Sequence, residues 1–287
     1  MLEIFGYSFM QRALIAGVLV GALCAVIGVY VVLKGLSFIG AGISHASFGG
    51  VAIGVALGIN PILSAVVFCL FVAWGIGLLS RRGNLKEDTA VGVFFASTMA
   101  LGILIIGLMQ GYQVDLFSYL FGSILAVTNQ DVWTTIAITA LVLGCVIFLY
   151  KDLMFVIFDS ETAEVTGVPA GKLYFLLISL VALTIVMSIK VVGIVLVSAL
   201  IVTPAAAAYQ LTESFRKMMA LSVLFGVGSS VLGLILSYQL GIASGATIVL
   251  LATLIFFVCA AFSPRRKRQK ALAQVETKSQ DSTVSNK

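Results

Sequence analysis

The sequence predicts an all-α, polytopic membrane protein with about nine transmembrane helices. Hydrophobic residues make up 61% of the 287 residues and charged residues only 10%, whereas a soluble domain carries about 25% charged residues. A run such as residues 13–32 is apolar on every face, so it lacks the alternation of a β-barrel strand. Because only a helix satisfies its own backbone hydrogen bonds inside lipid, each long apolar run is expected to be a membrane-spanning helix.

Nine apolar segments follow one another along the chain. Only Lys190 separates the sixth from the seventh, so a count of eight is also open. The segments define one membrane domain over residues 1–263, and the polar tail over 264–287 has little to bury and is expected to be disordered. The expected spans are residues 13–33, 38–58, 62–80, 89–109, 132–150, 173–189, 191–211, 218–238 and 244–262.

The basic residues predict the orientation of these spans, because loops rich in Lys and Arg stay in the cytoplasm. With nine spans and a cytoplasmic tail, all but Arg12 and Lys190 of the 17 Lys and Arg residues lie on the cytoplasmic side. The predicted topology places the N-terminus outside and the C-terminus in the cytoplasm. The net charge of +5 follows from this rule and requires no nucleic-acid partner, and the basic tail is expected to contact membrane lipid.

Two loops between spans are long enough to hold structure of their own. Residues 110–131, on the predicted outer side, are partly apolar and fit a short helix that lies on the membrane or dips into it. The other long loop, residues 151–172, is predicted to be cytoplasmic.

One short helix is predicted within the cytoplasmic loop, at about 160–166. Asp159 can cap its first turn, Glu161 and Glu164 lie near its positive end, and Gly167 can terminate it. A plain linker between spans needs no capped helix. We therefore expect this helix to form a docking surface for a cytoplasmic partner.

Motifs for ATP binding, metal-dependent proteolysis and serine hydrolysis are missing. The chain has no GxxxxGK[ST], no HExxH and no GxSxG motif, and it holds a single histidine, His45. All 12 acidic residues fall in predicted loops or termini, whereas ion-coupled carriers usually place ionisable groups inside their spans. The sequence therefore favours a passive pathway driven by a separate energy source over a secondary carrier, and no feature supports a non-transporting scaffold.

Small residues recur at helical spacing in two spans, which indicates either close helix packing or room for a backbone-lined pathway. In the seventh span, Pro204 removes a backbone hydrogen bond next to four alanines, which suits either a moving gate or a static bend. The small residues are Ala46, Gly50, Gly54 and Gly58 in the second span and Ser222, Gly226 and Ser230 in the eighth.

Four segments, in order, resemble the metal-cation permeases of bacterial ABC importers, which take up zinc, manganese or iron. They are LKGLSFIGAGISHASFGGVAIGVALGINP (33–61), VDLFSYLFGSILAVTNQDVW (114–133), FDSETAEVTGVP (158–169) and VVGIVLVSALIVTPAAAAYQL (191–211). The third lies where that family, like the related cobalamin and siderophore permeases, carries the cytoplasmic coupling helix. The resemblance runs from about residue 13 to residue 262.

This resemblance implies a type II ABC importer permease in a bacterial cytoplasmic membrane, with zinc or manganese as the expected cargo. Two copies of the chain would form the pathway, two ATPase subunits would dock on residues 158–169, and an extracytoplasmic solute-binding protein would deliver the ion. The chain would be no enzyme and would bind no cofactor, since ATP acts on the partner. A permease for a metal chelate is the alternative. The residues assigned to ATPase coupling are Asp159, Glu161, Ala163, Glu164 and Gly167.

His45 is the expected ligand along the ion pathway, together with Ser44. Many members of the resembled family carry an acid four residues before the histidine, in a Gly-Asp-x-x-Ser-His pattern, whereas this chain has Ala41 there. Zn²⁺ normally takes several protein ligands, so a lone imidazole predicts a transient stop rather than a tight site. The alternative is a structural histidine that is hydrogen-bonded within the bundle. The histidine is predicted near the inner end of the second span.

Overall fold

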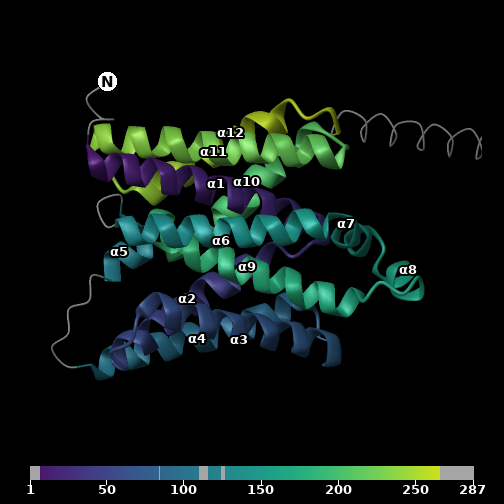
Figure 1. The fold of residues 1–287 in the computed structure, drawn as a ribbon, viewed down its shortest axis with the longest axis horizontal. Coiled ribbons are helices and arrows are strands. Elements are labelled where there is room, and N and C mark those ends of the chain that lie inside the picture. The colour runs from purple at the N-terminus through teal and green to yellow at the C-terminus, as the bar shows by residue number, and fades with distance from the viewer. Residues whose placement is uncertain (1–6, 84, 110–115, 124–126, 266–287) are drawn as a thin grey trace, which may run out of the picture.

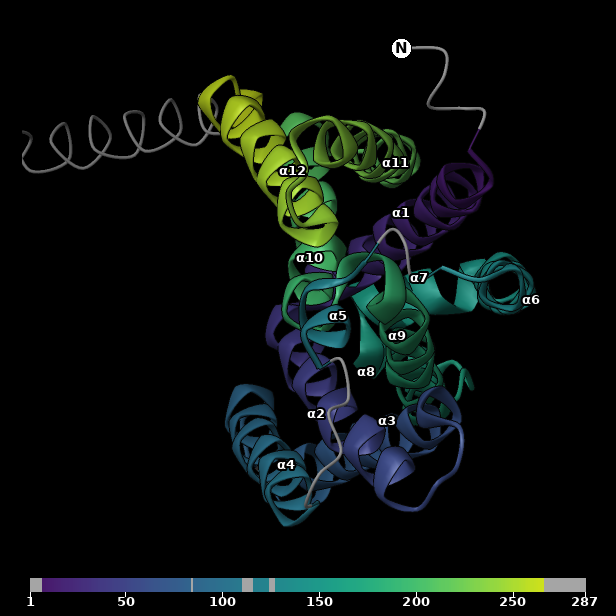
Figure 2. The same cartoon turned by 90° about the vertical axis from the view of Figure 1, so that its left-hand side faces the viewer.

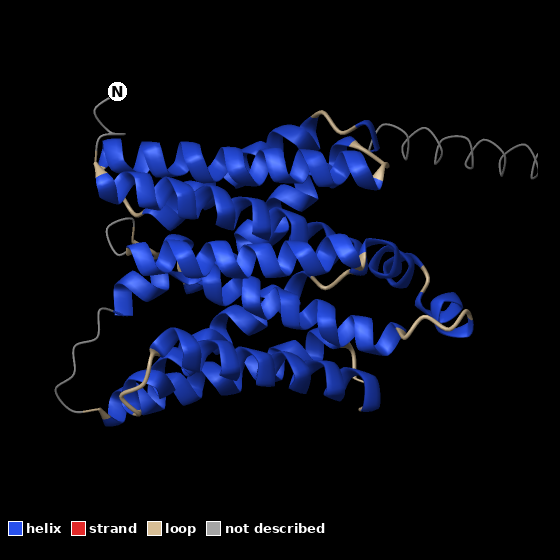
Figure 3. Ribbon diagram, viewed as in Figure 1, coloured by secondary structure: helices blue, strands red, loops and turns tan. Residues whose placement is uncertain are grey.

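The computed structural model describes residues 7–83, 85–109, 116–123 and 127–265. All regular elements in these ranges are α-helices (Figure 3). Nine of the described helices are long and apolar enough to cross a membrane, which confirms the predicted count. They are α1 (Ser8–Lys34), α2 (Ser37–Ala56), α3 (Pro61–Arg82), α4 (Glu87–Leu108), α6 (Asn129–Phe148), α9 (Ala170–Val192), α10 (Ile194–Leu211), α11 (Phe215–Leu240) and α12 (Ser244–Ala261).

A single glycine separates the two spans whose count was open. Gly193 has a φ of +92°, a conformation that residues with a side chain rarely adopt. It ends α9 and lets α10 begin at the next residue. The break between these two spans therefore depends on the glycine rather than on the charge of Lys190.

Three shorter helices complete the described part of the chain. The helix α5 (Leu116–Phe121) lies in the first long loop, where a short helix was expected, and α8 (Ser160–Val165) is the short helix expected in the second. The helix α7 (Tyr150–Phe158) was not predicted, so the expectation of one helix in that loop is wrong. Its buried side chains Leu153, Val156 and Ile157 follow the helical spacing of an amphipathic segment. The predicted disordered tail lies, but for its first two residues, outside the described residues.

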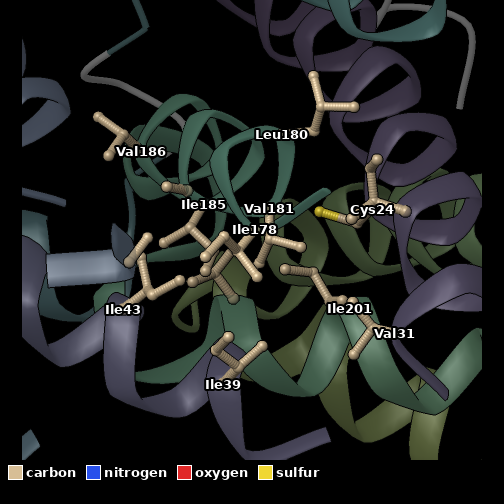
Figure 4. Close-up of a cluster of buried hydrophobic side chains, with 14 of the residues drawn as sticks. Cys24, Val31, Ile39, Ile43, Ile178, Leu180, Val181, Ile185, Val186 and Ile201 are labelled. Carbon is tan, nitrogen blue, oxygen red and sulfur yellow. The ribbon is translucent and has the colours of Figure 1, made fainter. Parts of the chain in front are cut away.

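The helices form a bundle with two distinct ends. The start of α1 and the helix α5 lie at one end, and α8 and the end of α12 lie at the other (Figure 1). Seen from the side, α10 and α2 run between α12 and α4 (Figure 2). The core lies where α1, α2, α9 and α10 meet, with Cys24, Ile43, Ile178 and Ile201 among its buried side chains (Figure 4).

Glycines bring several helices into backbone contact. A methyl group added at Gly50 would lie 2.7 Å from the Ala65 Cα, and one added at Gly54 would lie 2.7 Å from the Pro61 Cα, so α2 and α3 touch without side chains between them. The ridge does not extend to Gly58, contrary to expectation. The helix α2 ends at Ala56, and Gly58 lies in the following turn with a φ of +66°.

The small residues of the eighth span pack against α1. The Ser222 hydroxyl donates a hydrogen bond of 2.9 Å to the carbonyl of Ala25, and a methyl group added at Gly226 would lie 2.6 Å from the Gly21 carbonyl oxygen. Small residues in membrane helices allow this close approach. Pro204 is buried within α10, which continues as a helix on both sides of it.

Candidate functional site

The helix α2 is surrounded by its own chain, and its first half leaves only a narrow line accessible. Along this line, Phe38 is exposed and Ala41 and His45 are partly buried, at spacings of three and four residues. These spacings place the three side chains on one helix face. His45 lies close to the middle of α2 (Ser37–Ala56), so its predicted place near the inner end is corrected, because the helix ends before Gly58.

The imidazole of His45 has one partner on each of two helices. Its Nδ1 lies 3.0 Å from the carbonyl oxygen of Ala41, and its ring centroid lies 4.4 Å from that of Phe95 on α4. An Nδ1–H that donates to this carbonyl leaves the lone pair of Nε2 available for a cation. Among the described residues, no group of three or more His, Cys, Asp or Glu side chains could hold a metal ion, so His45 is not part of a chelating cluster within one copy.

Ser44 faces a different environment from its neighbour His45. It is fully buried, and its hydroxyl donates a hydrogen bond to the carbonyl of Ile194, the first residue of α10. This contact gives Ser44 a packing role between α2 and α10.

The helix α10 also leaves one line of side chains accessible. Its ends, Val195 and Tyr209, are exposed, and the intervening Ser198, Val202 and Ala206 are partly buried. The two helices touch near this line, since a methyl group added at Gly40 would lie 3.8 Å from the Ser198 Cβ. The accessible lines of α2 and α10 therefore lie on neighbouring helices.

The helix α8 has a defined start. The Asp159 side chain accepts a hydrogen bond of 2.9 Å from the backbone N–H of Thr162 and one of 2.6 Å from its hydroxyl. These hydrogen bonds hold the pKa of Asp159 below its ordinary value, because they stabilise the carboxylate. Asp159 thus acts as the helix cap that the sequence predicts.

The end of α8 is a Schellman turn. The N–H of Val168 donates to the Ala163 carbonyl at 2.9 Å, and the N–H of Gly167 donates to the Glu164 carbonyl at 3.1 Å. Gly167 has a φ of +90°, as the glycine after a helix usually does in this motif. The short helix is therefore fixed at both ends by local hydrogen bonds.

The coupling residues expected on α8 face different surroundings. Ala163 is fully buried and packs α8 against the bundle. The Glu164 Oε1 lies 3.8 Å from the Arg81 Nη2, whereas Glu161 is exposed. Two apolar side chains that sequence reasoning missed are also exposed, since Val165 is 88% and Phe158 64% exposed. Their signal was an apolar side chain in a segment predicted to lie in water. The outer surface of α8, which we define by Glu161 and Val165 together with Phe158 at the end of α7, is thus partly apolar.

A hollow lies at the opposite end of the bundle. Its volume is about 350 Å³, and it lies between the start of α1, the residues after α5 and the turn from α11 to α12. Its lining includes Phe9, Ser123, Tyr238, Ile242 and Ser244. The two ends of the bundle therefore offer different surfaces, a hollow at one and the projecting α8 at the other.

The fold and these surfaces define a polytopic membrane permease. The chain belongs to the ABC 3 transport family, whose model matches residues 6–263. This confirms the resemblance to ABC importer permeases and the all-α permease fold.

Several relatives are similar over almost their whole length. The manganese transport system membrane protein MntC of Listeria monocytogenes is 42% identical over 260 residues, which is 91% of this chain and 92% of the relative. The manganese import system permease protein ScaB of Streptococcus gordonii is 37% identical and covers 92% of this chain and 95% of its own. The chain also resembles a probable iron transport system membrane protein of Haemophilus influenzae, which is 35% identical over 93% of this chain and 98% of the relative.

Solved structures agree with this assignment. PsaBC from Streptococcus pneumoniae, in complex with Fab, superposes with a TM-score of 0.85 at 35% identity and covers 94% of this chain and 98% of the other. An inward-facing putative metal-chelate type ABC transporter superposes with a TM-score of 0.71 at 16% identity, over 88% of this chain and 85% of the other. The second likeness shows the fold alone.

Proposed function

We propose that this chain is the permease subunit of an ATP-driven importer of divalent metal ions and that Mn²⁺ is its main cargo. The observation that carries the proposal is the similarity, over about nine-tenths of both chains, to MntC and ScaB, whose names state manganese transport. The accessible His45 on α2 fits such a cargo. Mn²⁺ favours oxygen ligands and water, so one imidazole per copy suits a brief stop during passage.

The proposed transporter contains two copies of this chain. In that assembly the accessible lines of α2 and α10 face the partner copy, and the ion passes between them. Support comes from the burial pattern, since these lines lie on helices that are otherwise enclosed by their own chain. Two ATPase subunits dock on the outer surface of α8, and a solute-binding protein docks at the opposite, hollowed end.

The proposed orientation places α8 in the cytoplasm of a bacterium and the N-terminus outside its cytoplasmic membrane. The ends of α1 and α3 and the starts of α7, α9 and α11 all carry Lys or Arg, and Arg265 follows the end of α12. The ends of α12 and α8 lie at the same end of the bundle (Figure 1). A basic surface on this side agrees with the positive-inside rule.

Reconstitution tests the proposed function. The permease, its ATPase and its solute-binding protein are placed in liposomes, and uptake of Mn²⁺, Zn²⁺ and Fe²⁺ is measured with and without ATP. We expect ATP-dependent uptake with Mn²⁺ preferred. Uptake that persists without the ATPase and collapses with the proton gradient would instead identify a secondary carrier. A preference for Zn²⁺ would overturn the assignment of Mn²⁺ as the main cargo.

Removal of the imidazole is expected to slow the transport of Mn²⁺. In the same liposomes, His45→Ala should lower the initial rate by roughly tenfold, the effect of losing about 1.4 kcal/mol of interaction in the rate-limiting step. Ser97→Ala is the control, because Ser97 is exposed on α4 and its hydroxyl bonds to the Val93 carbonyl of its own helix. A His45→Ala permease with wild-type rate and ion preference would give His45 a structural role only.

A further inference from the structure

Arg81, in the last turn of α3, contacts two further helices with one guanidinium group. Its Nη2 lies 3.8 Å from the Glu164 Oε1 on α8, and its Cζ lies 5.3 Å from the ring centroid of Tyr174 on α9. The start of α9 leaves room for it, because a methyl group added at Gly171 would lie 2.5 Å from the Arg81 Nη1. The guanidinium is therefore held between α8 and the first turns of α9.

Electrostatic interactions extend from this contact to the start of α4. The buried Tyr174 interacts electrostatically both with Arg81 and with Glu87, the first residue of α4. A chain of charged and aromatic side chains thus runs from Glu164 on α8 through Arg81 and Tyr174 to Glu87. It joins α8 to the ends of α3, α9 and α4.

The helix α2 touches both α3 and α4 through backbone atoms. A methyl group added at Gly50 on α2 would lie 2.7 Å from the Ala65 Cα on α3, and one added at Gly49 would lie 2.8 Å from the Thr98 carbonyl oxygen on α4. Closely packed protein interiors pass strain on to their neighbours. A displacement at the end of α3 is therefore expected to reach α2 and its His45.

The Arg81–Glu164 pair is a poor source of stability. The two side chains are 40% and 58% exposed, and exposed ion pairs contribute only about 0.2–1 kcal/mol. The value of the pair lies in its position, since it joins the exposed α8 to the enclosed bundle. A loss of the pair should alter movement far more than folding.

We propose that Arg81 is a positioning residue that passes the movement of α8 to the packed helices α2, α3 and α4, so that ATP hydrolysis and ion passage stay coupled. The inference rests on the proposed function, because it takes α8 as the ATPase docking helix. It assigns to a residue about 80 positions away in sequence the task of connecting that helix to the pathway.

The test measures how many ions are imported per ATP hydrolysed in the complete reconstituted transporter. Arg81→Gln should lower this ratio by roughly threefold to tenfold. The variant should still assemble with the ATPase and hydrolyse ATP, and its unfolding temperature should stay within a few degrees of the wild type. Arg81→Lys keeps the charge but loses the planar group that stacks on Tyr174, so its ratio should be intermediate. Lys172→Gln is the matched control, because it removes an exposed positive charge from the same end of α9.

Charge reversal supplies the second measurement. Arg81→Glu alone should uncouple the transporter, and adding Glu164→Arg should restore part of the ratio, because it restores opposite charges at the contact. If Arg81→Gln does not assemble, Glu164→Gln carries the test, since it leaves Arg81 on Tyr174. If the wild type is tightly coupled and the Arg81 and Glu164 variants import as many ions per ATP as the wild type, this inference alone is overturned. A wild type without ATP-driven uptake would instead overturn the proposed function.

Discussion

A permease that carries Glu161→Lys and Val165→Asp is expected to lose ATP-driven uptake. Both side chains lie on the exposed outer surface of α8, and the second substitution puts a charge where an 88% exposed valine now offers an apolar contact. Burying an unpaired charge in a protein interface costs about 2 kcal/mol or more, so affinity for the ATPase should fall by about thirtyfold or more. Co-purification of the ATPase with the permease, together with uptake in liposomes, measures the effect.

The substitutions should leave the folded permease intact, because neither side chain takes part in the caps of α8. Asp152→Lys is the matched control, since it reverses an exposed acid on the neighbouring α7. We expect the control to bind the ATPase and to transport at the wild-type rate. Normal ATPase binding by the α8 variant would show that the partner docks elsewhere.

The Gly28→Ala permease is expected to be strongly destabilised. A methyl group at Gly28 on α1 would overlap the Ile201 carbonyl oxygen on α10 and would lie 3.3 Å from the Ala205 Cβ. The clash is with backbone, which cannot turn away as a side chain can, so α1 and α10 must separate. Overpacking of this kind costs about 1–3 kcal/mol. The loss is measured as a lower unfolding temperature of the detergent-purified permease.

The same substitution elsewhere provides the control. A methyl group added at Gly144 on α6 meets nothing within 4 Å, and alanine is a better helix former than glycine by about 1 kcal/mol in water. Gly144→Ala should therefore keep or raise the unfolding temperature. Equal stability of the Gly28 and Gly144 variants would mean that α1 and α10 do not pack as closely as described.

The membrane spans were predictable from the sequence because lipid imposes a simple rule on length and apolarity. The start of α1 at Ser8, before the polar pair Gln11 and Arg12, was not, since the helix continues beyond its apolar run. The helix α7 was not predictable either, because the charged residues Lys151 and Asp152 at its start are typical of a loop. Its burial depends on contacts with α1 and α9, which no local pattern contains.

The candidate sites divide in the same way. Asp159 and Gly167 were identified because caps and helix ends depend on local backbone chemistry. The Arg81–Glu164 contact was not identified, since it joins residues that are distant in sequence and that each look like ordinary loop charges. His45 was noticed because it is the single histidine of the chain. Its ring contact with Phe95 depends on the packing of α2 against α4, which no local pattern predicts.

The glycines of α2 also bear on how the permease is made. Of the nine described spans, α2 has the lowest mean hydropathy, because residues that permit close packing contribute little to membrane insertion. The translocon releases a helix into lipid according to its apolarity, and leucine, isoleucine, phenylalanine and valine each favour insertion by about 0.3–0.6 kcal/mol. The strongly apolar α1 and α3 lie on either side of α2 in the chain and can hold it in place. Biogenesis of the permease is therefore expected to integrate its first three spans together rather than one at a time.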